Sequence, residues 1–508
     1  MSTRAILGID AGTTAVKSVI LSDSGELLGM ARSTTHVLRP RPDFAEQDMD
    51  EIWRAVSMTI AAALDEAGDV ELVSVCVTGQ GDGAWLVDQE GRPTGPARLW
   101  LDGRAADRVA SWEGDGRADA VREITGSALF SGALPVLLEE IEEHHPEQLS
   151  AAVAHLNCKD WLRYKLTGRM ATDPTEASRG YLDVSTGVYS DELIARLGHE
   201  RFQRLLPQVL PSTAVAGVVT ETAARETGLP VGVLVATGVV DTPASGIGLG
   251  VVEPGQAYGI LGTTAFIGVL QHRKTAALDS PVITLSFDGT GDVLECFAPM
   301  NGTPNLDWAR EITGQSDLQW DEIGTLVTKE PAGSGGVLYL PYGSTNGERA
   351  PFVDPDASAA WLNLSVSTTS GQLLRAVYEG ICSSLRECAD RLHLPAGEMI
   401  KLSGGGAQSA ALCQILADVT QRPIERSTDA ELGARGVVAI ALVAAGLATD
   451  LAEATLMLRT PVERFEPDPS LARLYEMQAE IFERVRDANR ELWQAMRALR
   501  SASQRASS

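Results

Sequence analysis

Residues 6–21 read Ile6-Leu-Gly-Ile-Asp10-Ala-Gly12-Thr13-Thr14-Ala-Val-Lys17-Ser-Val-Ile-Leu21, the strongest structural signal in the chain. Two apolar runs rich in β-branched residues flank a short polar turn, which predicts two antiparallel strands joined at Gly12, Thr13 and Thr14. The turn offers backbone N–H groups, two hydroxyls and the nearby ammonium of Lys17, and all of these suit a phosphate oxygen. Asp10 has the wrong charge for phosphate but suits a hydrated Mg²⁺ that accompanies it. A plain hairpin, whose Gly and Thr merely favour the turn, stays open at this point.

The 508-residue chain has an ordinary globular composition, with 44% hydrophobic and 22% charged residues. A single core rarely grows beyond about 250–300 residues, so two or more domains are expected. The formal net charge of −26 argues against a nucleic-acid surface and against binding to anionic membranes. An anionic ligand such as ATP would need local groups and a metal, because the overall field repels it.

Several absences narrow the compartment and the chemistry. No stretch approaches the ~20 apolar residues of a membrane span, and the first residues enter a strand without a secretory signal. The six cysteines show no CxxC spacing, which favours reduced, buried thiols over disulfides or a zinc site. A cytoplasmic protein is therefore expected. His144 and His145 lie in an acidic helical stretch, where a solvated face is the better interpretation than a metal site.

The pattern of elements restarts near the middle of the chain. In the first half it predicts strands at 4–10, 15–21, 26–34, 72–78 and 84–87, a helix at 49–67, and helical segments within 104–165 and 190–206. In the second half it predicts a strand at 233–240, a small-residue helix up to 250, paired strands within 258–270, helices at 370–392, 408–420 and 430–445, and strands at 399–403 and 423–427. The polar tail 501–508 is expected to be disordered.

The stretch Tyr258–Leu270 repeats the opening pattern around Gly262, Thr263 and Thr264. This repeat predicts two similar lobes that face each other, each presenting a Gly-Thr-Thr tip. The second tip has no counterpart of Asp10, so only the first lobe would offer a carboxylate to a metal ion. No linker rich in Gly, Ser or Pro separates the halves, which favours two lobes packed across a cleft.

Asp241 ends an apolar strand and precedes Thr242 and Pro243. One interpretation is a cap for the following helix, with proline just inside it. The other is a general base that takes a proton from a substrate hydroxyl. Both interpretations stay open on local sequence.

Two further segments suit a ligand. Gly404, Gly405 and Gly406 stand between a strand and a helix, where a nucleotide could approach the backbone and the helix N-terminus, although tight packing also explains them. No Walker A loop or dinucleotide-binding G-x-G-x-x-G occurs. Amide, carboxylate and indole groups on the loops after residues 72–78 suit a polyhydroxylated ligand, with ordinary loop polarity as the alternative. These residues are Gln80, Asp82, Trp100, Asp102 and Arg104.

Together these elements resemble the FGGY family of carbohydrate kinases over roughly residues 4–490. The matching motifs are Asp10–Lys17, Leu99–Arg104, Asn157–Leu162, Leu166–Gly168, Thr172–Ser178, Gly238–Asp241, Gly262–Thr264, Glu348–Pro355 and Ser403–Ala407. The resemblance implies an α/β fold with two ribonuclease H-like lobes of the actin-like ATPase superfamily and an active site in the cleft between them. The expected parts are residues 1–245 on the substrate and metal side, residues 246–490 on the adenosine side, and residues 491–508 as a helix end and disordered tail.

The same resemblance assigns roles to individual residues. Asp241 corresponds to the family's catalytic base, and Asp10 to a metal position, with Mg²⁺ as cofactor and ATP as co-substrate. The expected ATP and phosphate contacts are Gly12, Thr13, Thr14, Lys17, Gly262, Thr263, Thr264, Gly404, Gly405, Gly406 and Ala407. The expected substrate contacts are Gly81, Asp82, Trp100 and Thr242 by resemblance, joined by Gln80 and Asp102 from the polar cluster.

The substrate that accepts the phosphoryl group is inferred from two positions where this chain differs from other members of the family. Glycerol kinases carry an Arg-Glu pair and xylulose kinases a Met-His pair where this chain has Gly81 and Asp82, which argues against glycerol and D-xylulose. The chain is most similar to erythritol kinases and next to L-xylulose kinases. The expected activity is therefore transfer of the γ-phosphoryl group of ATP to a terminal hydroxyl of a small polyol, erythritol first.

Other functions and assemblies stay open. A ketopentose kinase acting on L-xylulose or L-ribulose is the alternative within the family, and a non-catalytic actin-like scaffold or sensor is the alternative of another class. The expected partners are a small polyol or ketose and MgATP, with no nucleic acid and no membrane. A homodimer is the family-level expectation.

Overall fold

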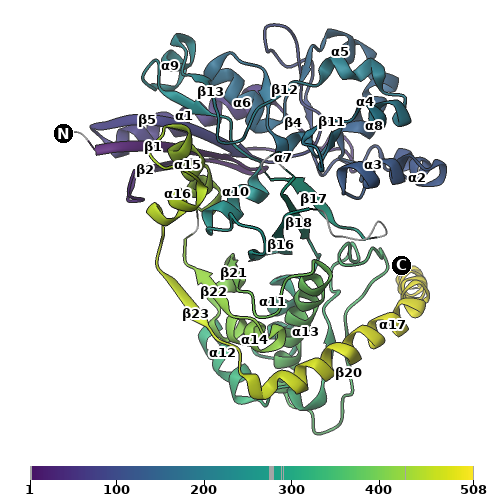
Figure 1. Ribbon diagram of the computed structural model, residues 1–508. Helices are drawn as coiled ribbons and strands as arrows, with labels where there is room; N and C mark the ends of the chain where they lie inside the picture. The colour runs from purple at the N-terminus through teal and green to yellow at the C-terminus, as the bar shows by residue number, and fades with distance from the viewer. Residues whose placement is uncertain (1–2, 274–279, 288, 290, 430, 507–508) are drawn as a thin grey trace.

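The computed structural model describes residues 3–273, 280–287, 289, 291–429 and 431–506, which form two α/β lobes (Figure 1). The long helix α17 (Ala472–Ala506) runs along the lower lobe. The expected disordered tail is wrong as far as Ala506, because the helix continues through 501–506. That stretch contains no Gly or Pro to end a helix and is rich in helix-compatible Ala, Gln and Arg. Residues 507 and 508 lie outside the described residues.

The sheet of the upper lobe has the strand order β13-β14-β5-β1-β2-β3. Its strands are β1 (Thr3–Ala11), β2 (Ala15–Ser22), β3 (Leu27–Thr34), β5 (Val70–Gly79), β13 (Val215–Val218) and β14 (Leu234–Ala236). Helix α1 (Met49–Ala67) packs on β2 and β3. Asp48 caps this helix by accepting the amides of Asp50 and Glu51, and the apolar residues at helical spacing face the core.

The sheet of the lower lobe has the order β17-β18-β16-β15-β21-β22-β23. Its strands are β15 (Ala257–Leu261), β16 (Ala265–Gln271), β17 (Ile283–Ser286), β18 (Val293–Phe297), β21 (Ile400–Ser403), β22 (Ile424–Ser427) and β23 (Val462–Phe465). In both sheets an antiparallel hairpin, β1–β2 or β15–β16, pairs in parallel with a later strand, β5 or β21. The predicted repeat of two similar lobes is confirmed by this shared order.

Two predicted strands are shorter than expected. The first, 84–87, is reduced to β6 (Leu86–Val87), and the second, 233–240, to β14. The second ends early because Gly238 adopts a positive φ of 82°, where a Cβ would lie 2.3 Å from the carbonyl oxygen of Val77. The chain therefore leaves the sheet before Asp241.

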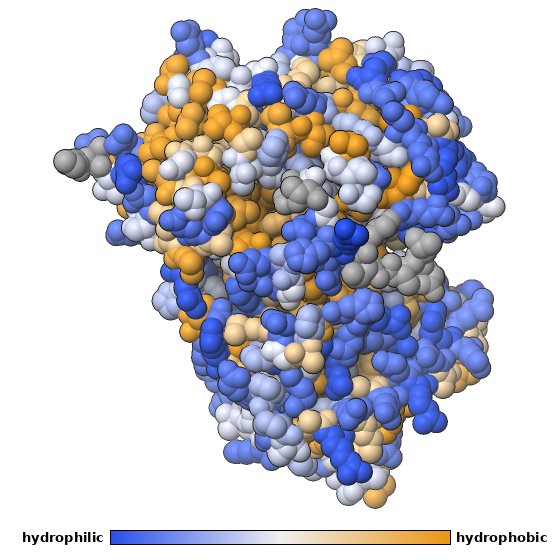
Figure 2. Space-filling model, in the orientation of Figure 1, coloured by the Kyte–Doolittle hydropathy of each residue, from blue (hydrophilic) through white to orange (hydrophobic). Residues whose placement is uncertain are grey.

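Helices α10 (Asp241–Gly248) and α15 (Leu432–Ala444) pack against each other between the two sheets. Glycines permit this contact, because a Cβ at Gly436 would lie 1.9 Å from the carbonyl oxygen of Ala244. Helix α15 also packs on β1 and β5 of the upper lobe, although it comes late in the chain. Figure 2 shows apolar residues gathered around this junction, whereas the lower lobe is mainly hydrophilic in that view. The division at 245/246 stays a prediction, and Ala430, the expected first residue of α15, lies outside the described residues.

The remaining elements connect the sheets or cover them. The helices of the lower lobe are α11 (Pro304–Ile312), α12 (Trp320–Lys329), α13 (Ser370–Arg391), α14 (Ala410–Thr420) and α16 (Leu451–Met457). The short elements are β4 (Glu46–Gln47), β7 (Ala97–Arg98), β8 (Ala154–His155), α6 (Cys158–Thr167), β9 (Ala171–Thr172), α7 (Pro174–Ala177), β10 (Leu182–Asp183), β11 (Val188–Tyr189), β12 (Gln208–Val209), α9 (Glu221–Thr227), η2 (Ser334–Gly336), β19 (Leu338–Leu340), β20 (Ala360–Leu362), η3 (Gly405–Gln408) and η4 (Pro469–Leu471). All six cysteines are buried and unpaired, as expected. None of the described helices is long and apolar enough to span a bilayer.

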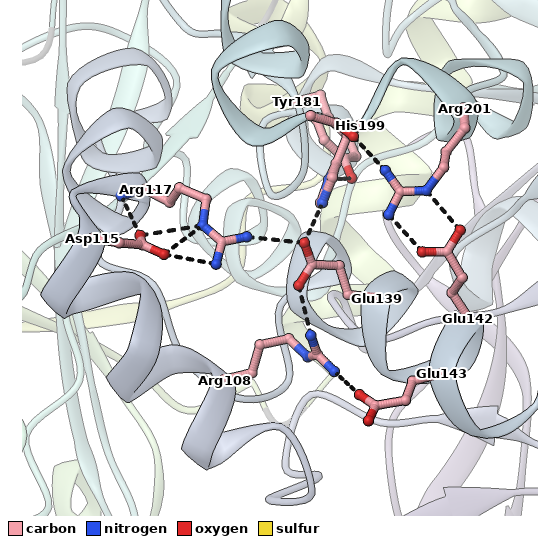
Figure 3. A network of polar contacts seen from close by, with 10 residues as sticks. Arg108, Asp115, Arg117, Glu139, Glu142, Glu143, Tyr181, His199 and Arg201 are labelled. Atoms are coloured by element: carbon pink, nitrogen blue, oxygen red, sulfur yellow. Dashed lines mark hydrogen bonds and ion pairs between the residues drawn. The ribbon is translucent and has the colours of Figure 1, made fainter.

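A helical cap stands beside the upper sheet and has its own apolar core. It consists of α2 (Ala106–Asp115), α3 (Arg117–Thr125), α4 (Leu134–His144), α5 (Pro146–Ala151), α8 (Asp191–Leu197) and η1 (Glu200–Leu205). Glu139 on α4 contacts α2, α3 and the turn between α8 and η1, because its carboxylate pairs with Arg108, Arg117 and His199 at 2.8, 3.0 and 3.1 Å (Figure 3).

Replacing Glu139 with glutamine should lower the free energy of unfolding by about 2–3 kcal/mol at pH 7. Burial opposes ionisation of this carboxyl, but hydrogen bonds from His199 and Arg108 outweigh it and hold the pKa of Glu139 at about 2. Because the pKa of Glu139 is lower in the folded state, its ionised form stabilises the folded protein. This stabilisation is complete above about pH 4.5, the ordinary pKa of the group, and is lost as the pH falls toward 2. Thermal unfolding should therefore separate wild type from Glu139→Gln at pH 7 and much less at pH 3.

The matched control is Glu142→Gln on the same helix. Glu142 pairs with Arg201 alone and is more exposed, so its loss should cost less than about 1 kcal/mol. Equal melting shifts for the two variants would contradict a stabilising role for the Glu139 network.

Candidate active site

The first Gly-Thr-Thr turn joins β1 to β2, as predicted, and is held by long-range hydrogen bonds. The carbonyl of Thr13 accepts the side-chain amide of Gln47 at 2.7 Å and the hydroxyl of Thr35 at 3.1 Å. The hydroxyl of Thr13 donates to Oε1 of Gln80 at 2.9 Å and accepts the indole N–H of Trp100 at 3.1 Å. The predicted phosphate turn and the predicted substrate loops are therefore bonded directly to each other.

These hydrogen bonds occupy polar groups of Gln80 and Thr13, two residues that were predicted to contact a ligand. Gln80 is buried, and its other end donates to Oε1 of Gln47 at 2.6 Å, so it positions Thr13 rather than presenting free groups. The Thr13 hydroxyl proton is likewise used within the protein. Thr14, by contrast, is exposed at the tip, and Gly12 beside it is half-buried. Backbone amides and Thr14 thus remain the groups of this turn that suit a phosphate.

Asp10 lies opposite Lys17 in the β1–β2 hairpin, close to the start of α15. A Cβ at Gly433 would lie 3.0 Å from Oδ2 of Asp10, which places the carboxylate at the positive end of that helix. Burial raises the pKa of Asp10 to about 6, with Lys17 opposing the shift and Glu431 adding to it. The ammonium of Lys17 pairs with Glu431 at 2.8 Å, so it is not free to bind phosphate in this arrangement.

Asp241 is the first residue of α10, and Val240 is the N-cap. The capping interpretation is therefore wrong: the helix has no side-chain cap, and Oδ1 of Asp241 instead accepts the hydroxyl of Thr242 at 3.2 Å. The segment is anchored because the amide of Val240 donates to the hydroxyl of Thr175 at 3.0 Å. Burial raises the pKa of Asp241 to about 7, and the charge of Asp10 contributes. A carboxylate that ionises near neutral pH suits a general base.

The donor set around Asp10 and Asp241 fits a hard divalent cation. Burial disfavours the charged form of both carboxylates, the charge of Asp10 adds to this effect at Asp241, and a cation would relieve it. Within the part of the chain that the structure describes, no group of three or more His, Cys, Asp or Glu is arranged to hold a metal. The pair Asp10 and Asp241 suits Mg²⁺, which takes one or two carboxylates and completes its shell with water and substrate phosphates.

The substrate loops are also built by close contacts. A Cβ at Gly81 would lie 2.4 Å from Cγ2 of Val240. Any side chain at position 81 would therefore force Val240 to move, and Val240 is the residue before Asp241. Asp82 adopts a positive φ of 59° and pairs with Arg179 at 3.1 Å. Trp100 remains 38% exposed.

The prediction that Asp102 contacts the substrate is wrong in this structure. Its side chain is 0% exposed. Its oxygens accept the amides of Ala45 and Arg104 and two N–H groups of the Arg104 guanidinium, at 2.8–3.0 Å. Arg104 itself stacks over the ring of Phe44. Asp102 therefore shapes the loop that carries Trp100.

The second Gly-Thr-Thr turn, Gly262–Thr264, joins β15 to β16 and leaves Thr263 exposed, as the first turn leaves Thr14. The carbonyl of Gly262 accepts the amide and the hydroxyl of Thr303 at 2.8 and 3.1 Å. Thr303 also lines a groove of about 530 Å³ between α11, α12, α14 and the Gly404–Gly406 loop. The second turn and the groove are therefore continuous through one residue.

The three glycines of this loop have different tasks. Gly404 has φ 96°, and a Cβ there would lie 2.4 Å from the carbonyl oxygen of Leu261. A Cβ at Gly406 would lie 2.8 Å from Cβ of Leu261, so both glycines permit tight packing. Gly405 has no atom within 4 Å of its Cβ position and lines the groove, whereas Ala407 is buried. The packing interpretation is confirmed at Gly404 and Gly406, and the contact of Gly405 with a nucleotide stays a prediction.

Sequence reasoning missed the side chains that pair with the predicted ones. Glu431 pairs with Lys17, Arg179 with Asp82, and Glu176 lies beside Gly81. Glu176 and Arg179 belong to or follow the motif Thr172–Ser178, where charged residues in a stretch of small residues were the available signal. The partner of Lys17 is 414 positions away and had no local signal.

Comparisons with known proteins match most of the length of the chain and its fold. Models of the N-terminal and C-terminal domains of the FGGY family of carbohydrate kinases match residues 5–248 and 257–445. The chain is 32% identical to the erythritol kinase of Brucella abortus, over 95% of each chain. It is 28% identical to a probable L-xylulose kinase of Pasteurella multocida, over 95% of this chain and 98% of that protein. The crystal structure of a gluconate kinase from Lactobacillus acidophilus has the same fold, with a TM-score of 0.90, 23% identity and coverage of 97% and 100%.

Proposed function

Because the chain belongs to the FGGY family of carbohydrate kinases, a family of phosphotransferases that act on sugar or polyol hydroxyls, we propose that its acceptor is a small polyol, erythritol first. The family uses ATP as phosphoryl donor, typically with a divalent metal. The relative with 32% identity is an erythritol kinase, and Gly81 and Asp82 differ from the pairs expected for glycerol and D-xylulose. The product would be the polyol phosphorylated on a terminal carbon.

The geometry supports in-line phosphoryl transfer. The adenosine of ATP would lie in the groove beside Gly405, with its γ-phosphoryl group between the tips at Thr14 and Thr263. Asp241 would accept the proton of the terminal hydroxyl as that oxygen attacks phosphorus. Little covalent chemistry is required of the protein in such a transfer, so positioning and charge stabilisation would account for most of the rate.

The residues that would hold Mg²⁺ are Asp10 and, through water, Asp241. When bound, the ion would neutralise charge on the phosphates during transfer. Asp10 would orient it from the end of β1, and the start of α15 would keep this carboxylate in place.

One observation carries the proposal: the hydrogen bonds from Trp100 through Thr13 to Gln80 join the acceptor loops to the phosphate turn. A nucleotide-binding scaffold would not need this connection. The reduced thiols favour a cytoplasmic enzyme, and a homodimer stays a family-level prediction.

The test is a coupled ADP-release assay over erythritol, threitol, glycerol, D-xylulose, L-xylulose, L-ribulose and gluconate. Erythritol should give the highest kcat/KM. A higher value for L-xylulose or L-ribulose would replace the polyol with a ketopentose. ADP release that no acceptor changes would favour the actin-like scaffold instead.

A further inference from the structure

A cavity of about 20 Å³ adjoins Asp82 and Arg179, and no step proposed above uses it. By this measure a water molecule needs about 10–15 Å³, so the cavity admits one water-sized group. Its wall includes His155, Asn157 and Glu176, which come from β8, the start of α6 and α7. These three polar residues therefore come from separate segments that meet beside Asp82.

The wall presents buried polar atoms that no described protein group satisfies. They are both carboxyl oxygens of Glu176, Oδ1 of Asn157 and Nε2 of His155. The three residues are 2%, 5% and 6% exposed. A buried polar group without a hydrogen bond destabilises the folded protein. Four such atoms around one small space indicate a polar occupant.

The polar groups of the wall favour a neutral occupant that can both donate and accept a hydrogen bond. Burial raises the pKa of Glu176 well above its usual range, although Lys159 opposes the shift, so burial favours the neutral acid form of this group. Burial lowers the pKa of His155 to about 4, and its ring bonds to the backbone of Gly83. A hydroxyl can donate to Asn157 or His155 and accept the proton of the Glu176 acid.

The cavity shares a wall with the catalytic segment. A Cβ at Gly81 would lie 3.3 Å from Oε2 of Glu176 and 2.4 Å from Cγ2 of Val240. On the other side of α7, Thr175 accepts the amide of Val240.

We infer that this cavity is an acceptor subsite, in which Glu176, Asn157 and His155 bind the hydroxyl at the end of the polyol remote from the transferred phosphoryl group. The inference rests on the proposed function. It makes Glu176 and Asn157 specificity-determining residues, because an acceptor without that hydroxyl would leave the same four atoms unsatisfied.

The test compares erythritol with butane-1,2,3-triol, which lacks one terminal hydroxyl. A site built to bind a hydroxyl rejects the analogue without it, so wild type should favour erythritol by ~10²-fold or more in kcat/KM. Glu176→Leu should reduce this preference at least tenfold, mainly by raising KM for erythritol. Glu176→Gln should stay within about threefold of wild type, because a neutral amide keeps a donor and an acceptor.

Controls separate this role from a structural one. Ser286→Ala removes a buried unpartnered hydroxyl outside the cavity wall and should leave the preference unchanged. If Glu176→Leu fails to fold by circular dichroism, Asn157→Ala decides in its place. If a ketopentose is the acceptor, the two polyols are replaced by that ketopentose and by its deoxy analogue, which keeps the phosphorylated hydroxyl and lacks the other terminal one.

Each outcome decides one proposal. A preference that stays unchanged in a folded Glu176→Leu or Asn157→Ala would overturn the subsite, leaving a trapped water and the kinase proposal intact. Wild-type ADP release that depends on no acceptor would overturn the proposed function and the subsite with it.

Discussion

Replacing Asp241 with asparagine should lower kcat by ~10²–10⁴-fold while KM for ATP changes little. The amide keeps the shape of the side chain but cannot take the proton of the attacking hydroxyl. The assay belongs at pH 8, because the pKa of Asp241 is raised to about 7 and the wild-type carboxylate is then mostly ionised. Initial rates with saturating acceptor and single-turnover measurements would locate the loss in the chemical step.

The stability of this variant separates catalysis from misfolding. A buried carboxylate whose pKa is raised destabilises the folded state when ionised, so Asp241→Asn should melt at the wild-type temperature or above it. Asp450→Asn is the matched control, since Asp450 caps α16 outside the site and asparagine caps nearly as well. Near-wild-type turnover in Asp241→Asn would remove this residue from the role of base.

Replacing Lys159 with methionine should destabilise the protein by about 3–5 kcal/mol, the usual cost of removing one partner from a buried ion pair. The ammonium is 0% exposed and lies 2.6 Å from Asp160 and 2.8 Å from Asp173. Methionine would leave two buried carboxylates with Arg163 as the nearest remaining cation, 2.9 Å from Asp160. A lower apparent melting temperature at a fixed scan rate is the measurement.

This ion network also positions the site. Asp173 accepts the amides of Thr175 and Glu176 at the start of α7, and Arg163 donates to the carbonyl of Thr237, four residues before Asp241. We therefore expect Lys159→Met to lose activity below its melting temperature as well.

Lys165→Met is the matched control on the same helix. Lys165 is half-buried and lies over the rings of Trp53 and Trp161, so its loss should cost about 1 kcal/mol or less. Equal shifts for Lys159→Met and Lys165→Met would contradict the predicted stabilising role of the buried network.

The sequence predicted the parts of the site that depend on neighbouring residues. The turns at Gly12–Thr14 and Gly262–Thr264 follow from apolar runs that flank Gly and Thr, and the structure has a hairpin at each. The repeated lobe follows from the same pattern found twice. Asp241 at the start of α10 and the glycines before α14 could be found because strand-to-helix junctions have local signals.

Tertiary structure alone decided which polar groups are free to act. Asp102 and Gln80 read as ligand contacts, but both are buried and used within the protein. Lys17 reads as a phosphate ligand, but Glu431 from the far end of the chain pairs with it. Glu176, unassigned in the sequence, is a buried acid whose two oxygens accept no hydrogen bond from the described residues. The reason is that hydrogen-bond saturation and burial depend on contacts between distant segments, whereas turns and strand ends depend on adjacent residues.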